Sequence, residues 1–121
     1  MIFIKQLFFQ YFTIITFPFF KAKVEFLSMS SCEALERVRE IRFDLIYVDG
    51  NHQMASVLRD AELSWSLLKK GGLLIFDDYR WKDKKTGQTP VRNALTQFLK
   101  LRDRQFEIVF KDYQLILKKM I

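Results

Sequence analysis

Carboxylates and a single histidine follow two apolar runs in the middle of the chain. Asp49 comes directly after the first run, and His52, the only histidine of the sequence, lies three residues further on. Asp77 and Asp78 follow the second run. Carboxylates that lie close together repel one another unless a cation neutralises them, and Mg²⁺ prefers such oxygen ligands. These residue types predict a metal site at Asp49, Asp77 and Asp78, with His52 beside it as a general base.

The elements that carry these residues form a β–α–β pattern. Residues 43–48 and 73–76 are short apolar runs, and residues 53–69 between them place apolar side chains on one helical face. Strands joined by a crossover helix run parallel, and their carboxyl ends lie about 5 Å apart when the strands are neighbours. Open α/β sheets bind ligands at that edge. We therefore expect the sheet to bring the acids and the histidine together.

The flanking segments predict further elements on both sides of this unit. Residues 23–27 alternate weakly and suit a short strand, and Ser30 with Glu33 forms the capping-box pattern of a helix start. The pair Gly71-Gly72 predicts a left-handed end to the central helix. A third helix is expected to begin at 89–90, where proline follows threonine. Residues 106–110 and 113–117 are expected to pair as antiparallel strands.

Composition indicates one packed domain. The chain has 121 residues, half of them hydrophobic, which excludes a disordered protein. The net charge of +6 is spread along the chain, so we expect a solvated surface and no nucleic-acid partner. Cys32 is the only cysteine, which excludes an internal disulfide and fits a reducing, cytoplasmic location.

Residues 1–20 are dense in phenylalanine and β-branched side chains. No small-residue cleavage motif follows, as a signal peptide would need. Lys5, Gln6, Gln10 and Pro18 interrupt the apolar run, so a transmembrane helix is not expected. We interpret this segment as a hydrophobic N-terminal extension that covers the sheet. Membrane attachment through it stays open as an alternative.

The stretch FDLIYVDGNHQMASVLRDAELSWSLLKKGGLLIFDDY, residues 43–79, resembles the fourth strand, following helix and fifth strand of class I S-adenosylmethionine-dependent methyltransferases. It is most similar to their metal-dependent O-methyltransferase-like group. The resemblance implies S-adenosylmethionine as methyl donor, Mg²⁺ as metal, and a hydroxyl oxygen of a small molecule or sugar as acceptor. It implies Asp49, Asp77 and Asp78 as metal ligands and His52 as base. It also implies Ser31 and Asp49 as cofactor contacts, with Ser31 near the adenine.

A complete domain of that group begins with a strand, a glycine-rich loop and a second strand, but no glycine occurs in the first 49 residues. We therefore expect an α/β fold with an incomplete Rossmann-like methyltransferase sheet that lacks its first two strands and glycine loop and ends in an antiparallel strand. Residues 21–121 would be the C-terminal part of the domain. The strand at 43–48 would have a bare edge, which residues 24–27, part of residues 2–20 or another chain would pair, in a homo-oligomer or with a partner chain. The alternative function is a truncated, non-catalytic remnant or interaction module.

Overall fold

The computed structural model describes residues 2–7, 11–16, 23–27 and 29–121. Its elements follow the chain in this order: β1 (Ile2–Leu7), β2 (Tyr11–Thr16), β3 (Lys23–Leu27), α1 (Ser31–Arg37), β4 (Phe43–Val48), α2 (Met54–Leu67), β5 (Leu68–Phe76), α3 (Pro90–Lys100), β6 (Phe106–Lys111) and β7 (Leu115–Lys119).

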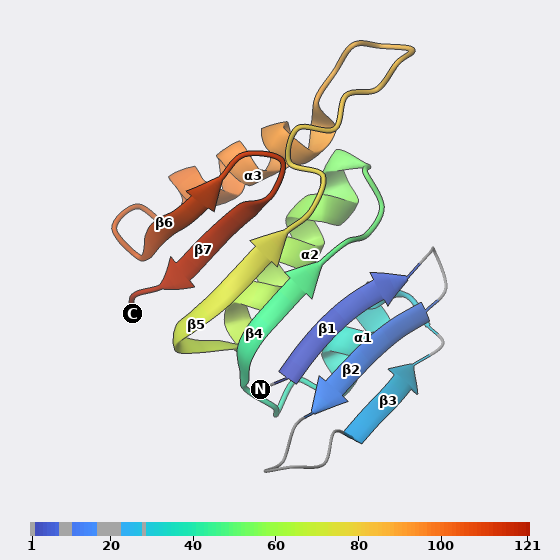
Figure 1. Ribbon diagram of the computed structural model, residues 1–121, viewed down its shortest axis with the longest axis vertical. Helices are drawn as coiled ribbons and strands as arrows, with labels where there is room; N and C mark the ends of the chain where they lie inside the picture. The colour runs from blue at the N-terminus through green and yellow to red at the C-terminus, as the bar shows by residue number, and fades with distance from the viewer. Residues whose placement is uncertain (1, 8–10, 17–22, 28) are drawn as a thin grey trace.

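The C-terminal part forms a four-stranded sheet in the order β4-β5-β7-β6 (Figure 1). β4 and β5 are parallel neighbours, whereas β7 runs antiparallel to both β5 and β6. The predicted β–α–β unit and the antiparallel last strand are therefore confirmed. Within the described residues, β1, β2 and β3 form a separate antiparallel sheet.

The edge of β4 that the sequence left bare has β1 beside it, and both arrows point the same way in Figure 1. Read across the molecule, the strands lie in the order β3-β2-β1-β4-β5, which is also the order of a Rossmann sheet. The pairing differs, because β2 runs antiparallel to both of its neighbours instead of parallel. In the described part of the chain, no ladder of hydrogen bonds joins β1 to β4.

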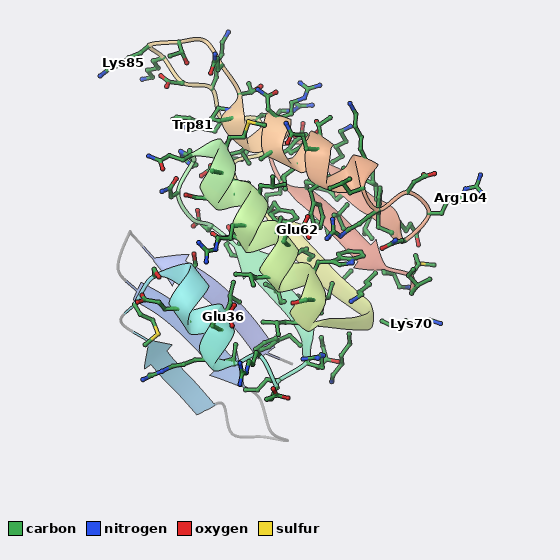
Figure 2. The ribbon with its side chains drawn as sticks, turned by 180° about the vertical axis from the view of Figure 1, so that it is seen from behind. Glu36, Glu62, Lys70, Trp81, Lys85 and Arg104 are labelled. Carbon is green, nitrogen blue, oxygen red and sulfur yellow. The ribbon has the colours of Figure 1, made fainter. Side chains whose placement is uncertain are left out.

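The three helices of the described residues lie on one face of the sheets. The view from behind shows this, with Glu36 on α1 and Glu62 on α2 toward the viewer (Figure 2). The core lies between these helices and the sheet, where Ile46, Leu74 and Phe76 are almost completely buried. Leu45, Leu73 and Ile75, which alternate with buried residues on the same strands, are only partly buried. The second face of these strands is more open, because the described helices cover only one side of the sheet.

The junction between α2 and β5 also differs from the prediction. α2 ends at Leu67, and its C-cap Leu68 already has extended backbone angles. The predicted left-handed helix end at Gly71-Gly72 is wrong, because both glycines lie within β5. Phe43 of β4 pairs with Leu68 of β5, and Leu45 of β4 pairs with Leu73. The β5 segment between these pairs is longer than the β4 segment, so β5 is irregular there. Gly71 has a φ of +80°, which a residue without Cβ adopts easily.

Gly72 lies where the irregular segment touches its neighbours most closely. A Cβ atom there would lie 2.9 Å from the Leu68 side chain and 3.0 Å from the carbonyl oxygen of Asp44 on β4. The backbone oxygen cannot move without disturbing the β4–β5 pairing. A side chain at this position is therefore incompatible with the observed register.

We predict that Gly72→Ala lowers the free energy of unfolding by about 1–3 kcal/mol, because it overpacks a closed site. Urea denaturation followed by circular dichroism measures this change. The matched control is Lys70→Ala, two residues away and exposed. Equal stability of the two variants would contradict the register described here.

The C-terminal elements bring Tyr113 to the carboxyl end of β5. α3 begins at Pro90 as predicted. β7 begins at Leu115 instead of residue 113, because Asp112 donates its backbone N–H to the Gln114 carbonyl, 2.9 Å away, in the turn after β6. Leu115 pairs with Phe76, the last residue of β5, so this turn lies at the same edge as the acids.

Within the described ranges, no helix is long and apolar enough to cross a membrane.

Candidate functional site

The predicted acids lie at one edge of the sheet. The last parallel pair is Val48 with Phe76, and the backbone N–H of Asp77 donates to the Val48 carbonyl at 2.9 Å. Asp49 and Asp77 therefore follow two adjacent strand ends. Both side chains are partly buried. The parallel connection brings them together, as the β–α–β pattern predicted.

His52 contacts one of these acids directly. Its Nε2 lies 2.8 Å from Oδ2 of Asp78, and both side chains are mostly shielded, with 30% and 24% exposed. The Tyr113 hydroxyl donates to the other oxygen of Asp78 at 2.7 Å. Asp78 has a φ of +57°, a conformation that aspartate tolerates better than most residues. Its N–H donates to Oδ1 of Asp77 at 2.8 Å. Asp78 is thus held between a histidine and a tyrosine.

Two tyrosines at this edge of the sheet, Tyr47 and Tyr113, have raised pKa values. Burial raises the pKa of Tyr47 strongly, and the hydrogen bond that its hydroxyl donates to Asp77 and the charges of Asp77 and Asp49 add to the effect. The hydrogen bond to Asp78 raises the pKa of Tyr113, and burial and the charges of Asp78, Asp77 and Asp49 contribute further. Both phenols are therefore near the negative charge of Asp77 and Asp49. Each phenol is kept as a proton donor.

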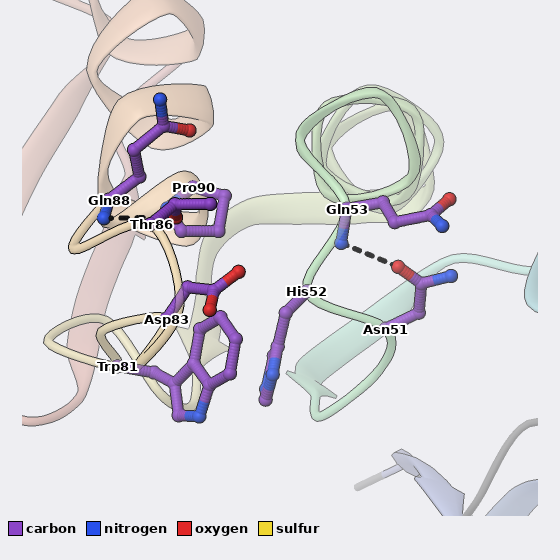
Figure 3. A pocket seen from close by; sticks show the side chains of 8 residues that line it. All are labelled: Asn51, His52, Gln53, Trp81, Asp83, Thr86, Gln88 and Pro90. Atoms are coloured by element: carbon purple, nitrogen blue, oxygen red, sulfur yellow. Dashed lines mark hydrogen bonds between the residues drawn. The ribbon is translucent and has the colours of Figure 1, made fainter.

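A cavity of about 390 Å³ opens beside His52, between the start of α2 and the loop that follows β5 (Figure 3). The His52 ring packs against Trp81, with ring centroids 4.1 Å apart and a tilt of 34°. The residues that line the cavity are Asn51, His52, Gln53, Trp81, Asp83, Thr86, Gln88 and Pro90. The cavity gives a small molecule access to the histidine.

Ser31 lies apart from these contacts. It is the first residue of α1, and its hydroxyl donates to Oδ1 of Asp60 on α2 at 2.6 Å. Asp60 is only 6% exposed, and burial raises its pKa. Asp60 was not among the predicted site residues. The available signal was its place on the buried face of the helix, three residues after Val57 and next to Ala61.

Mg²⁺ fits the residue types of the site but not their present arrangement. Among the residues that the structure describes, no group of three or more His, Cys, Asp or Glu side chains is arranged to hold a metal. The four carboxylate oxygens of Asp77 and Asp78 are all hydrogen-bonded to Tyr47, His52, Tyr113 or backbone. A cation would have to replace several of these bonds. The roles of Asp49, Asp77 and Asp78 as ligands therefore stay predictions.

Tyr47 and Tyr113 are site residues that sequence reasoning did not identify. Tyr47 lies two residues before Asp49 on β4, so strand alternation places both on the same side. Tyr113 lies in the turn before an antiparallel strand, which must begin where its neighbour β5 ends. Tyr79, which follows Asp78 directly, is 5% exposed and belongs to the core.

We predict that Tyr47 makes stability fall with rising pH in the alkaline range. Its folded pKa lies above the unfolded value of about 10, so its contribution is fully present below about pH 10 and is lost above it. Urea midpoints measured between about pH 8 and pH 11 test this. Tyr47→Phe should show a shallower alkaline decline than the unaltered chain. Parallel declines of the two proteins would contradict the hydrogen-bonded phenol described here.

Comparison with known sequences gives a consistent classification. Residues 6–79 match a family model described as a methyltransferase domain. A curated relative, the uncharacterized protein R132 of Acanthamoeba polyphaga mimivirus, is 42% identical over 41 residues. That match covers 31% of this chain and 19% of the relative.

Comparison with solved structures shows the fold. The MycE methyltransferase from the mycinamycin biosynthetic pathway, in complex with Mg and SAH, has a TM-score of 0.59 at 16% identity, over 78% of this chain and 32% of that chain. The O-methyltransferase from Bacillus cereus, in complex with SAH, has a TM-score of 0.51 at 15% identity, over 72% of this chain and 46% of that chain. The predicted incomplete, Rossmann-like methyltransferase fold is confirmed. The chain spans less than half the length of either structure.

Proposed function

Because this chain belongs to the methyltransferase domain family that matches residues 6–79, we propose that it binds S-adenosylmethionine and methylates a hydroxyl oxygen of a small molecule or sugar. The observation that carries the proposal is the contact between His52 and Asp78 at the carboxyl edge of β4 and β5. This pair lies beside a cavity large enough for a small acceptor. Both solved structures named above contain SAH.

The proton chemistry follows from how His52 is held. A carboxylate can only accept hydrogen bonds, so the 2.8 Å contact places the imidazole proton on Nε2, between His52 and Asp78. Nδ1 is then the basic nitrogen and can take the proton of an acceptor hydroxyl. Asp78 stabilises the resulting imidazolium, while Tyr113 keeps its carboxylate in place. Removal of that proton makes the acceptor oxygen a stronger nucleophile.

S-adenosylmethionine, when bound, supplies the electrophilic methyl group. Ser31 and Asp49 are the residues that we propose to contact it, because both are polar, partly buried and placed after strands of the ligand-binding half of the fold. The hydroxyl proton of Ser31 is directed to Asp60, which leaves the oxygen lone pairs available to a ligand. The glycine-rich loop of a complete domain has no counterpart in the first 49 residues.

The proposed reaction also includes assistance by a divalent metal ion. Asp49, Asp77 and Asp78 would hold the cation after rotating away from their present partners, and a bound metal would lower the pKa of an acceptor hydroxyl. The supporting observations are the clustered negative charge of this edge and the Mg of the MycE structure. Without the metal, Asp78 holds His52 as the base for the acceptor proton.

We predict that the purified chain binds S-adenosylmethionine with a dissociation constant on the order of micromolar, and that Asp49→Asn weakens binding about tenfold by removing a charged hydrogen-bond acceptor. Isothermal titration calorimetry with Mg²⁺ and with EDTA measures both effects. Asp103→Asn, an exposed acid outside the site, is the matched control. Tighter binding with Mg²⁺ that disappears in Asp77→Asn supports metal assistance.

The negative outcomes separate the parts of the proposal. No binding by a chain that is shown to be folded would contradict the enzymatic function and favour a remnant or interaction module. Equal binding with Mg²⁺ and with EDTA would contradict only the proposed metal. An Asp49→Asn variant that binds as well as the control would remove Asp49 from the cofactor site.

A further inference from the structure

The cavity beside His52 has an uneven charge. Of its eight lining residues, Asp83 is the only carboxylate, and neither lysine nor arginine is among them. Its volume, about 390 Å³, lies in the range of small-molecule sites. We propose that this cavity holds the methyl acceptor and that Asp83 selects an uncharged molecule with at least two hydroxyl groups over an anionic one. The reaction at the first hydroxyl rests on the proposed function; the binding selectivity does not.

The place of the base defines where the reacting hydroxyl would lie. His52 lines the cavity and also contacts Asp78, so a hydroxyl inside the cavity would lie next to the imidazole. Figure 3 shows His52 on one side of the cavity and Asp83 on the other, each carried by a different segment. A ligand that reaches both side chains needs two polar groups. One would give its proton to His52, and the other would meet Asp83.

Asp83 is held firmly by its own loop. Its Oδ1 accepts the backbone N–H of Lys85 at 2.8 Å, and its backbone N–H donates to the Gln88 carbonyl at 2.9 Å. Its carbonyl accepts the N–H of Gly87 at 2.8 Å. Within the described residues, its Oδ2 has no hydrogen bond or ion pair. This fixed, partly buried carboxylate oxygen is therefore available to a ligand.

The chemistry of Asp83 determines what it accepts. A carboxylate oxygen only accepts hydrogen bonds, so its partner must be a donor, and a hydroxyl group is one. A phosphate or carboxylate of a ligand would instead meet a like charge in a partly shielded site. Trp81 and Pro90 add apolar surface to the same cavity. These features together fit a neutral diol or polyol with an apolar face.

The lysines of the same loop oppose this selection. Lys82, Lys84 and Lys85 are exposed, and none of them lines the cavity. Figure 2 shows Lys85 at the far tip of the loop, beyond Trp81. Exposed charges are screened by salt within about 8–10 Å at physiological ionic strength, whereas a partly buried carboxylate is screened less. We therefore infer that Asp83, not the lysines, sets the charge preference at the cavity.

A matched pair of probes tests the inference without any cofactor. Methyl glucopyranoside and methyl glucuronide share one ring and differ by a hydroxymethyl group against a carboxylate. Each is titrated into the ¹⁵N-labelled full chain at physiological ionic strength, and the indole N–H signals of its two tryptophans are followed by NMR. Trp81 lines the cavity, whereas Trp65 lies in the core and is the internal control. Trp81→Phe assigns the two signals.

The expected result is a saturable shift of the Trp81 signal with the neutral glycoside and at least about tenfold weaker binding of the glucuronide. In Asp83→Asn this ratio should fall toward one, while Asp103→Asn should keep it. Equal or tighter binding of the glucuronide by the unaltered chain would overturn the inference. It would show that the lysines of the loop set the charge preference at the cavity. No Trp81 shift with either probe would overturn it as well. The comparison of the two probes needs no variant, so a misfolded Asp83→Asn chain does not weaken the test.

Failure of this inference is distinguishable from failure of the proposed function. If the cavity selects the neutral probe but the chain does not bind S-adenosylmethionine, the binding site stands and the reaction is wrong. If the chain binds S-adenosylmethionine but the cavity has no preference, the reaction stands and the acceptor site lies elsewhere.

Discussion

Parallel pairing of β4 with β5 is the constraint on which the rest of the site depends. Since α2 carries the chain back to the start of the sheet, both strands must end at the same edge. Asp49 and Asp77 leave from adjacent strand ends, and Asp78 and His52 follow within reach of one another. If the two strands were antiparallel, their acids would lie at opposite edges. The β–α–β connection thus creates both the negative charge and the histidine contact.

The antiparallel strand β7 adds to the same edge from the other end of the sequence. Because it begins beside the end of β5, the turn before it delivers Tyr113 to Asp78. Asp78 consequently has a partner from the β4–α2 connection and another from the C-terminal hairpin. The site is built from three segments that are distant in sequence. Its geometry therefore depends on the correct register of the whole C-terminal sheet.

The sequence predicted the parts that local patterns determine. Two apolar runs, the amphipathic segment between them and the acids after each run indicated the β–α–β unit. Ser30 with Glu33 forms the capping box, as predicted. The end of α2 was predicted wrongly, since Gly71 and Gly72 serve a strand irregularity that depends on the close approach of β4. The contact of Ser31 with Asp60 was also out of reach, because it joins two helices 29 residues apart in sequence. Local propensity carries no information about such tertiary contacts.

The most direct test of the account maps where the methyl-donor product binds. Backbone amide shifts of the ¹⁵N-labelled chain are recorded by NMR during titration with S-adenosylhomocysteine. The account predicts that the largest shifts occur at Ser31, at residues 49–52 and at residues 77–78, which follow the ends of β3, β4 and β5. Saturable shifts centred instead on β6 and the end of α3, far along the sheet from β4, would contradict it, as would the absence of any shift.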